Sequence, residues 1–283
     1  MKRIEFANGK SADIPTSWEE MTPEQIRRVF RLHDECVRKG RSPLEFNIRV
    51  LLFVFLGIRP SRKIAHLAPM ISEKVYLMCE ECLGFLFTAE RAKPGVLELA
   101  YRGVENPIPL IRRPFRRPLK GPKALLQDLS FGRFRNASRA LQEFFKNKDI
   151  GALDECIAWL YDDGRPHPVR DGRDPRTVSG LAAWQKNLIM SWFASCLNYI
   201  QTQTITIDGE DVDMKLLFSG SGSDAPAERF TWKDLVVQIS RDGSIGNMDA
   251  VDEEPLFSIL SILWCNYKEN KRDEKIRKAS KTK

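Results

Sequence analysis

The stretch LAAWQKNLIMSWFASCLNYI at 181–200 constrains the fold more than any other part of the chain. Its apolar side chains recur at helical spacing along two adjacent stripes. The first stripe is Leu181, Trp184, Leu188, Trp192 and Cys196, and the second is Ile189, Phe193, Leu197 and Ile200. A helix that is apolar on most sides is typical of the centre of a helical bundle. Its length is close to a membrane span, but Gln185, Lys186, Asn187 and Asn198 would be costly in hydrocarbon. We therefore expect a buried core helix and no membrane partner.

The basic character of the chain is confined to two segments. The net charge is +7, yet the block RRPFRRPLKGPK at 112–123 alone holds six Lys or Arg and no acid. The segment 268–283 adds eight Lys or Arg against three acids, so the rest of the chain is slightly acidic. The basic balance therefore describes these two segments and not the fold as a whole.

The N-terminal region predicts a small helical domain over residues 1–90, with a β-hairpin docked on it. The hairpin spans residues 2–15, because Asn8-Gly9 is suited to a two-residue turn between short alternating flanks. The run Thr22-Pro23-Glu24-Gln25 has the order of a helix cap, an N1 proline and a capping-box glutamine. Three helices are expected, at about 22–40, 42–58 and 71–88.

Residues 91–123 predict a Pro/Arg-rich linker, apart from a short strand at 96–101. Five prolines between 107 and 122 are expected to exclude regular structure and to favour an extended path. A second helical, bundle-like domain follows at 124–267, so the expected fold class is mainly α. Its expected helices end near 146 and span 149–160, 181–200, 230–239 and 254–267, with an exposed loop at 161–174.

Three shorter features complete the predicted second domain and its tail. Asp208-Gly209 in TITIDGEDV predicts a small hairpin over 204–212. The Gly/Ser run at 219–223 predicts a flexible linker. The basic tail at 268–283 is polar throughout, which predicts a segment that is frayed or helical only when bound.

The cysteines and histidines predict no disulfide framework and leave one metal site to consider. The six cysteines lie mostly in apolar helical patterns, which favours reduced, buried thiols. His33 and Cys36, with Cys79 and Cys82, have the composition of a Cys₃His zinc site. Zinc knuckles place C-x₂-C in tight turns, whereas this pair lies on a predicted apolar helix. Two core thiols are therefore the better interpretation, and we expect no metal and no cofactor.

The residue pattern favours binding over catalysis. The chain has three histidines, and none accompanies a Ser or Cys in a nucleophile motif. The acidic residues at 162–163 and 171–174 have the chemistry of cation ligands, but interleaved arginines favour a loop that neutralises itself. The glycines at 219–223 are not followed by the Lys-Ser/Thr of a phosphate-binding loop.

The basic block is the candidate binding site. Its residues are Arg112, Arg113, Phe115, Arg116, Arg117, Lys120 and Lys123. An extended, arginine-rich segment is suited to phosphates or to an acidic protein surface. A solvated spacer between domains is an equally good interpretation at this stage. Neither basic segment matches a motif that reads DNA sequence.

Four stretches of the chain together resemble one protein family. They are IPTSWEEMTPEQ at 14–25, GPKALLQDLSFGRFRNASRALQEFFKNKDIGALDECIAWLY at 121–161, the helix at 181–200, and FTWKDLVVQISRDGSIGNMDAVDEEPLFSILSILW at 230–264. The resemblance is to a mostly helical family encoded in the tail modules of phages and prophages of Bacteroidota. It implies a role in virion assembly, such as that of a tail assembly chaperone, with no site residues to carry over.

These observations predict a non-enzymatic phage assembly protein with other tail or virion proteins as partners. Its expected location is the host cytoplasm, since no apolar run follows Lys2 and Arg3 to form a signal peptide. The resemblance implies the virion as a second location. Two alternatives remain open. One is a virion or connector protein that binds nucleic acid non-specifically through the basic linker and tail, and the other is a small structural component of the tail.

Overall fold

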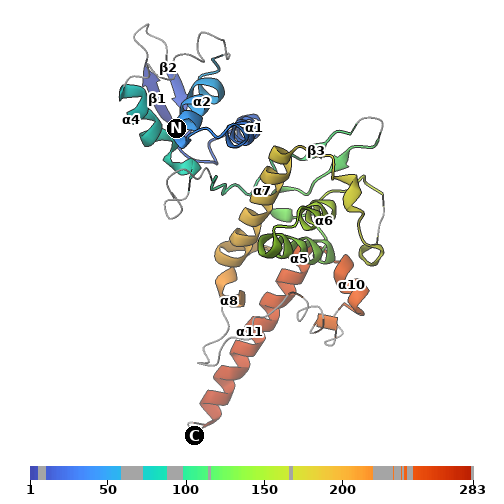
Figure 1. Cartoon of the computed structure of the whole chain (residues 1–283). Helices are drawn as coiled ribbons and strands as arrows, with labels where there is room; N and C mark the ends of the chain where they lie inside the picture. The colour runs from blue at the N-terminus through green and yellow to red at the C-terminus, as the bar shows by residue number, and fades with distance from the viewer. Residues whose placement is uncertain are drawn as a thin grey trace. The chain divides into compact units, whose positions relative to one another are not determined.

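The computed structural model describes residues 1–5, 11–58, 73–87, 98–113, 116–165, 168–218, 232, 237, 239–240 and 245–281. The chain divides into two compact units. The first comprises residues 1–108 and 181–195, and the second comprises residues 109–180 and 196–283. Helices dominate the described residues, and their strands form short antiparallel pairs, which confirms the predicted mainly α fold class (Figure 1).

The first unit contains the predicted N-terminal hairpin and helices. Its elements are β1 (Lys2–Glu5), β2 (Ser11–Ile14), α1 (Pro23–Arg38), α2 (Pro43–Arg49), the π-helix η1 (Val50–Phe55), α4 (Glu73–Leu83), the 3₁₀ turn η3 (Gly84–Leu86) and most of α7 (Ala183–Thr202). β1 and β2 pair antiparallel as predicted, with Lys2 opposite Ile14. The Asn8-Gly9 turn between them lies outside the described residues.

Local sequence signals set the ends of the first helices. Thr22 caps α1 by accepting a hydrogen bond from the Gln25 amide, and the Gln25 side chain accepts one from the Thr22 amide, so the capping box is confirmed. Ser42 caps α2 in the same way, through the amide of Glu45. The apolar run after α2 continues as the π-helix η1 and stops before Gly57, whose φ is +63°.

An aromatic cluster forms much of the core of the first unit. The Trp18 ring centroid lies 5.0 Å from that of Tyr101 and 5.7 Å from that of Phe85, with both pairs edge-on. Phe30 on α1 lies 6.1 Å from Trp18 and completes the cluster. Such edge-to-face pairs stabilise a core beyond the area that they bury. The short strand predicted at 96–101 is reduced to a single bridge from Leu99 to Phe87, and residues 88–97 are outside the description.

The central helix has the predicted buried character. Six side chains of α7 are fully buried, namely Leu188, Ile189, Trp192, Phe193, Cys196 and Ile200. The Trp192 indole NH donates to the Val104 carbonyl oxygen at 2.9 Å, so its polar atom is satisfied inside the core. The Arg31 guanidinium lies 4.9 Å from the centre of the Trp184 ring, within the range of a cation–π contact.

The second unit is built around two adjacent helices. Its elements are β3 (Leu110–Ile111), β4 (Leu119–Lys120), η5 (Ala124–Leu126), α5 (Phe131–Asn147), α6 (Ile150–Leu160), η6 (Val169–Asp171), η7 (Pro175–Thr177), the end of α7, β5 (Thr204–Ile207), β6 (Glu210–Asp213), α8 (Met214–Phe218), α10 (Met248–Glu253) and α11 (Leu256–Lys281). α5 and α6 lie side by side (Figure 1). Lys148 ends α5 with φ of +58°, and Asp149 then caps α6, so the turn between them is tight.

Two predictions for this unit are confirmed and one is wrong. β5 and β6 pair antiparallel around Asp208 and Gly209, whose φ values of +51° and +83° suit the predicted two-residue turn. The helix predicted at 254–267 is present as α11. The tail was expected to be frayed or helical only when bound, but α11 continues to Lys281. A helix that is anchored at one end adds residues at little cost, because its nucleus has already formed.

Two predicted features of the second unit fall mainly outside the description. They are the Gly/Ser linker at 219–223 and most of the helix at 230–239.

The compact units also divide the chain between Ile108 and Pro109, and they assign residues 181–195 to the first unit. No local pattern in the sequence signals that one helix contributes to both units.

Candidate functional site

The basic block folds as part of a short hairpin and not as an open linker. Leu110 and Ile111 of β3 pair antiparallel with Lys120 and Leu119 of β4. The expectation that the prolines exclude regular structure from this segment is therefore wrong. Pro118 directly precedes β4, and Pro109 directly precedes β3, so neither ring removes a donor that the two-pair ladder needs.

The Arg113 side chain holds the connection between these strands. Its Nε and Nη2 atoms donate to the Arg117 carbonyl oxygen at 2.9 and 2.6 Å. The chain between them includes residues 114 and 115, which lie outside the description, so the predicted site residue Phe115 has no described position. Arg113 therefore stabilises the loop of the hairpin through its contact with the Arg117 backbone.

The hairpin is anchored to the helical layer through Asp162. The Lys120 amide donates to the Asp162 carbonyl oxygen at 2.7 Å, and the Asp162 amide donates back to Lys120 at 3.0 Å. The Asp162 carboxylate in turn accepts a hydrogen bond from Arg133 of α5 at 2.5 Å. Leu119 and Ile111 are buried, with 3% and 2% of their surface exposed. The strands therefore have fixed positions within this unit, unlike those of a solvated spacer.

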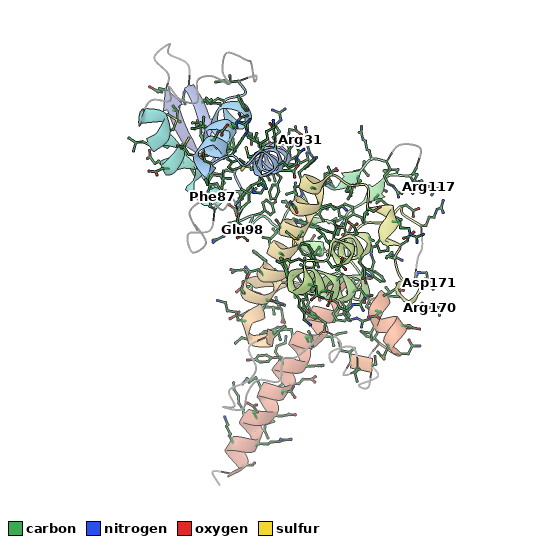
Figure 2. The ribbon with its side chains drawn as sticks, viewed as in Figure 1. Arg31, Phe87, Glu98, Arg117, Arg170 and Asp171 are labelled. Atoms are coloured by element: carbon green, nitrogen blue, oxygen red, sulfur yellow. The ribbon has the colours of Figure 1, made fainter. Side chains whose placement is uncertain are left out.

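The remaining cations of the block are exposed. Arg112, Arg116, Arg117, Lys120 and Lys123 are exposed, whereas Arg113 is half-buried. Arg117 lies at the edge of the second unit (Figure 2). None of these six side chains forms an ion pair with a carboxylate in the described part of the chain. The structure thus brings the six predicted cations together on one hairpin and the turn after it, with their charges unneutralised.

The basic tail differs from the hairpin because part of its charge is paired. Lys268 forms an ion pair with Glu210 of β6 at 2.6 Å, and Lys271 forms one with Glu274 at 3.5 Å. Hydrogen bonds from Lys268 and Trp264 lower the pKa of Glu210. The contacts of Lys268 and Trp264 with Glu210 attach α11 to the β5–β6 hairpin, so the beginning of the tail has a structural role.

The four residues considered for zinc are distributed over two helices of the first unit. His33 and Cys36 lie on α1, and Cys79 and Cys82 lie on α4, with all three thiols buried. Burial raises the pKa of Cys79 to about 11 and also raises those of Cys36 and Cys82. A zinc ligand must be a thiolate, which such an environment disfavours. Among the described residues, no group of three or more His, Cys, Asp or Glu side chains has the arrangement of a metal site.

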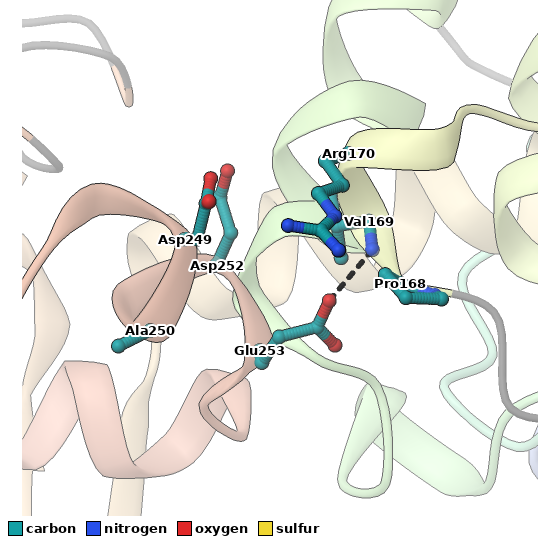
Figure 3. A pocket seen from close by; sticks show the side chains of 7 residues that line it. All are labelled: Pro168, Val169, Arg170, Asp249, Ala250, Asp252 and Glu253. Atoms are coloured by element: carbon teal, nitrogen blue, oxygen red, sulfur yellow. Dashed lines mark hydrogen bonds between the residues drawn. The ribbon is translucent and has the colours of Figure 1, made fainter.

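Sequence reasoning missed an acidic pocket between η6 and α10. The pocket has a volume of about 440 Å³ and is lined by Pro168, Val169, Arg170, Asp249, Ala250, Asp252 and Glu253 (Figure 3). The Val169 amide donates to the Glu253 carboxylate at 2.6 Å and joins the two sides of the pocket. The two lining segments are separated by about eighty positions in the sequence, so no local motif could have revealed this site.

Two of the lining residues, Val169 and Asp252, closely approach Gly132 of α5. A Cβ atom at Gly132 would lie 2.7 Å from the Asp252 Cβ and 2.8 Å from the Val169 Cγ1, so only glycine fits there. Arg135, one turn further along α5, donates to the Asp252 carboxylate at 2.6 Å. Burial nevertheless raises the pKa of Asp252, because the loss of solvation outweighs the attraction of Arg135.

Comparisons with known proteins yield no relative from which a function could be transferred. No protein-family model, curated protein or solved structure matches this chain. Across the described residues, no helix has both the length and the apolar character that a bilayer crossing requires.

Proposed function

We propose that this chain is a non-enzymatic assembly protein of a phage or prophage tail module. In this proposal it binds other virion proteins through the β3–β4 hairpin. The observation that carries the proposal is the set of exposed hairpin arginines that have no ion-pair partner among the described residues. The virion context comes from the sequence resemblance to tail-module proteins, and the structure supports the binding surface.

The chemistry of these side chains favours an anionic partner. Arginine presents a planar fork of donors that matches a carboxylate with two parallel hydrogen bonds. Arg112, Arg116 and Arg117 leave their guanidinium groups exposed, so binding a partner breaks no described ion pair. Complementary charge of this kind increases the association rate and selects the partner more than it increases affinity.

The placement of the hairpin supports the same function. Its strands are held by the Lys120–Asp162 bridge, and Asp162 is held by Arg133. A surface on a fixed scaffold loses less conformational entropy on binding than a flexible tail does. The strands next to these arginines therefore have fixed positions.

A binding experiment tests the role of the hairpin. The variant Arg112→Ala/Arg116→Ala/Arg117→Ala removes three exposed charges and retains Arg113, which holds the loop. The matched control is Arg272→Ala/Lys275→Ala/Arg277→Ala, which removes three exposed charges from α11. We expect the hairpin variant to lose at least about tenfold in affinity for co-expressed tail proteins, whereas the control retains most of it. Equal losses in the two variants would show that only total charge matters.

The virion context has a separate test. Quantitative mass spectrometry compares purified particles with the lysate that produced them. A fixed ratio to the major tail protein in particles identifies a structural component of the tail. Abundance in the lysate with absence from particles identifies an assembly factor. Absence from both contradicts the proposal.

Nucleic-acid binding is the second candidate, because guanidinium groups also match phosphates. The acid-free sequence of the hairpin block favours it. Phosphate contacts predict that affinity for duplex DNA or RNA decreases steeply with salt concentration. The slope of log affinity against log salt should be smaller by about three in the hairpin variant, because three phosphate contacts are lost. No binding at low salt would exclude this candidate and leave the protein partner.

A further inference from the structure

The second half of α11 is a helix whose cations gather on one face. Residues 268–280 contain six Lys or Arg and three acids. Five of these cations follow one another at i, i+3, i+4, i+7 and i+10, which places them on one face of the helix. This basic face consists of Lys268, Lys271, Arg272, Lys275 and Lys278. We propose that the basic face of α11 binds the phosphate backbone of duplex DNA.

The acids of this segment do not neutralise the basic face. Glu269 and Asp273 lie about 100° and 140° around the helix axis from Lys268, away from the other cations of the face. Glu274 lies beside the face and forms an ion pair with Lys271 at 3.5 Å. Both of these side chains are more than 40% exposed, and such pairs contribute little, so a phosphate can replace Glu274.

The described part of the chain leaves the basic face open. The fully buried residues of α11 are Leu256, Ile259 and Leu260, all in its first turns. The second half of the helix extends past α5 and α8 to the C-terminal end of the described residues (Figure 1). From 268 to 280 every residue is exposed except Lys271, which is half-buried. The ion pair between Lys268 and Glu210 holds the beginning of this segment.

The composition of the face favours phosphates over carboxylates. Four of its five cations are lysines, whose ammonium group is a compact point charge that suits a row of phosphates. The block at 112–123 instead contains four arginines, whose forked guanidinium groups match single carboxylates. The two basic surfaces of the second unit therefore favour different partners.

The segment lacks the apolar residues that a membrane or a helical partner requires. Between 268 and 280 the apolar residues are Ile276 and Ala279. A helix that lies on a membrane surface has a broad apolar face. A helix that pairs with another in a coiled coil has an apolar residue at every third or fourth position. Neither pattern is present, so charge is the main attraction that this segment offers.

The nearest aromatic rings are already occupied, which disfavours single-stranded nucleic acid. Binding of single strands depends on aromatic rings that are free to stack on bases. Trp264 and Tyr267 stack on each other with ring centroids 5.5 Å apart. Lys268 and Lys271 lie over these two rings at 5.7 Å. Duplex DNA needs no such stacking.

The dimensions of a single helix match the major groove of B-DNA. An α-helix with its side chains is about 10–12 Å across, and the groove is about 12 Å wide. From Lys268 to Lys278 the basic face extends over about 15 Å. Duplex DNA has one phosphate charge per about 1.7 Å of its axis, so several phosphates lie within reach. The major groove of duplex RNA is too narrow for side chains, which makes DNA the better match.

The test measures binding of the full chain to fluorescently labelled duplex DNA of mixed sequence. Fluorescence anisotropy is recorded over a range of salt concentrations, and we expect a dissociation constant on the order of micromolar at low salt. The variant Arg272→Gln/Lys275→Gln/Lys278→Gln removes three cations of the face, keeps a good helix former at each position and retains Lys268. In this variant the slope of log affinity against log salt should be smaller by about three, with at least about tenfold weaker binding at low salt.

Two further variants show whether the face itself is responsible. The hairpin variant Arg112→Ala/Arg116→Ala/Arg117→Ala removes the same number of charges and is expected to retain the parent slope. Asp273→Lys/Lys275→Glu keeps the net charge but disrupts the face, and it should bind more weakly than the parent. The proposal is overturned by no binding at low salt, by a parent slope in the α11 variant, or by equal losses in the α11 and hairpin variants. A loss in the hairpin variant alone would assign DNA binding to the hairpin.

Competition experiments test the choice of partner. Polyglutamate presents carboxylates, and vesicles of phosphatidylglycerol present an anionic lipid surface. If either displaces the DNA at an equal concentration of charge, the partner is an acidic protein or a membrane and the proposal is overturned. The measurement is independent of the proposed function, because it contains no tail protein. Failure of the hairpin to bind tail proteins would therefore leave the result for α11 unchanged.

Discussion

The arginines of α5 and those of the β3–β4 hairpin lie in the same unit but have opposite surroundings. Arg133 is 15% exposed and donates to the Asp162 carboxylate and to the carbonyl oxygens of Trp159 and Leu160. Arg117 is exposed and uses its backbone carbonyl, and not its side chain, in the hairpin. One guanidinium group stabilises the fold, whereas the other is available to a partner.

The difference follows from the number of acceptors within reach. α6 ends at Leu160, so its last carbonyl groups lack helical partners, and Arg133 satisfies two of them. The block at 112–123 contains no acid, and no described carboxylate lies within ion-pair distance of its arginines. Mutations can therefore distinguish the two kinds of arginine. We expect substitutions of paired arginines to lower stability and substitutions of unpaired arginines to weaken binding.

The largest effect is expected for Arg133→Ala. The substitution leaves the Asp162 carboxylate without its cation and two helix-end carbonyl groups without a donor. We expect the free energy of unfolding to decrease by about 3 kcal/mol. Urea denaturation, followed by a spectroscopic signal from the second unit, measures this change. Arg133→Lys should recover only part of this loss, since an ammonium group cannot reach all three acceptors. The comparison fails if Arg133→Ala and Arg112→Ala destabilise the chain equally.

A somewhat smaller effect is expected for Gly132→Ala, which tests how Asp252 is positioned opposite Arg135. The new methyl group would lie 2.7 Å from the Asp252 Cβ and must displace α10 or η6. Overpacking of this kind costs about 1–3 kcal/mol, again measured by urea denaturation. Gly180→Ala is the control, because a Cβ there meets nothing within 4 Å. A neutral Gly132→Ala would show that α10 shifts without strain.

Arg113→Ala is expected to have a local effect only. Arg113 donates twice to the Arg117 carbonyl oxygen, so its loss loosens the hairpin by about 1 kcal/mol. Hydrogen exchange of the Lys120 amide, which donates to Asp162, should become about fivefold faster. The same amide in Arg112→Ala should exchange at the parent rate. Unchanged exchange in both variants would mean that the Asp162 bridge alone holds the hairpin.

Local signals in the sequence were sufficient to predict much of the fold. The Thr22–Gln25 capping box and the Asp208-Gly209 turn depend on neighbouring residues, and both are present as predicted. The helix at 181–200 was predictable because its apolar residues repeat at helical spacing. Features of this kind require no knowledge of the tertiary structure.

The candidate sites were less predictable, because they depend on contacts between distant segments. The cations of the basic block were identified, but their hairpin depends on Asp162, which is some forty positions away. The acidic pocket requires residues 168–170 and 249–253 to meet across Gly132. The tail lacks an apolar stripe after Tyr267, so its helix could not be recognised from periodicity.

The smallest effect is expected for an exposed ion pair. Its arginines have a carboxylate partner, as Arg133 does, but they lie at the surface, as the hairpin arginines do. Hydrogen bonds from Arg27 and then Arg28 lower the pKa of Glu24 in the first turn of α1. A carboxylate whose pKa is lower in the folded state stabilises the fold fully at pH values above its ordinary pKa of 4.5. This contribution is lost as the pH falls from 4.5 through the lower pKa of the folded state. Exposed pairs contribute little, so Glu24→Gln should lower stability by about 0.5 kcal/mol or less at neutral pH.

This difference between Glu24→Gln and the parent should shrink as the pH falls from 4.5 and disappear below the lowered pKa of the folded carboxyl, because the parent side chain is then neutral in both the folded and the unfolded state. Thermal denaturation between neutral and acidic pH measures the two stabilities, and high salt should reduce the gap at neutral pH. Glu19→Gln, at an exposed site nearby, is the control for the general effect of removing one acid. A stability difference that is independent of pH would assign the effect of Glu24 to packing or helix propensity. Arg27 and Arg28 would then gain no stability from their ion pairs, like the unpaired arginines of the hairpin.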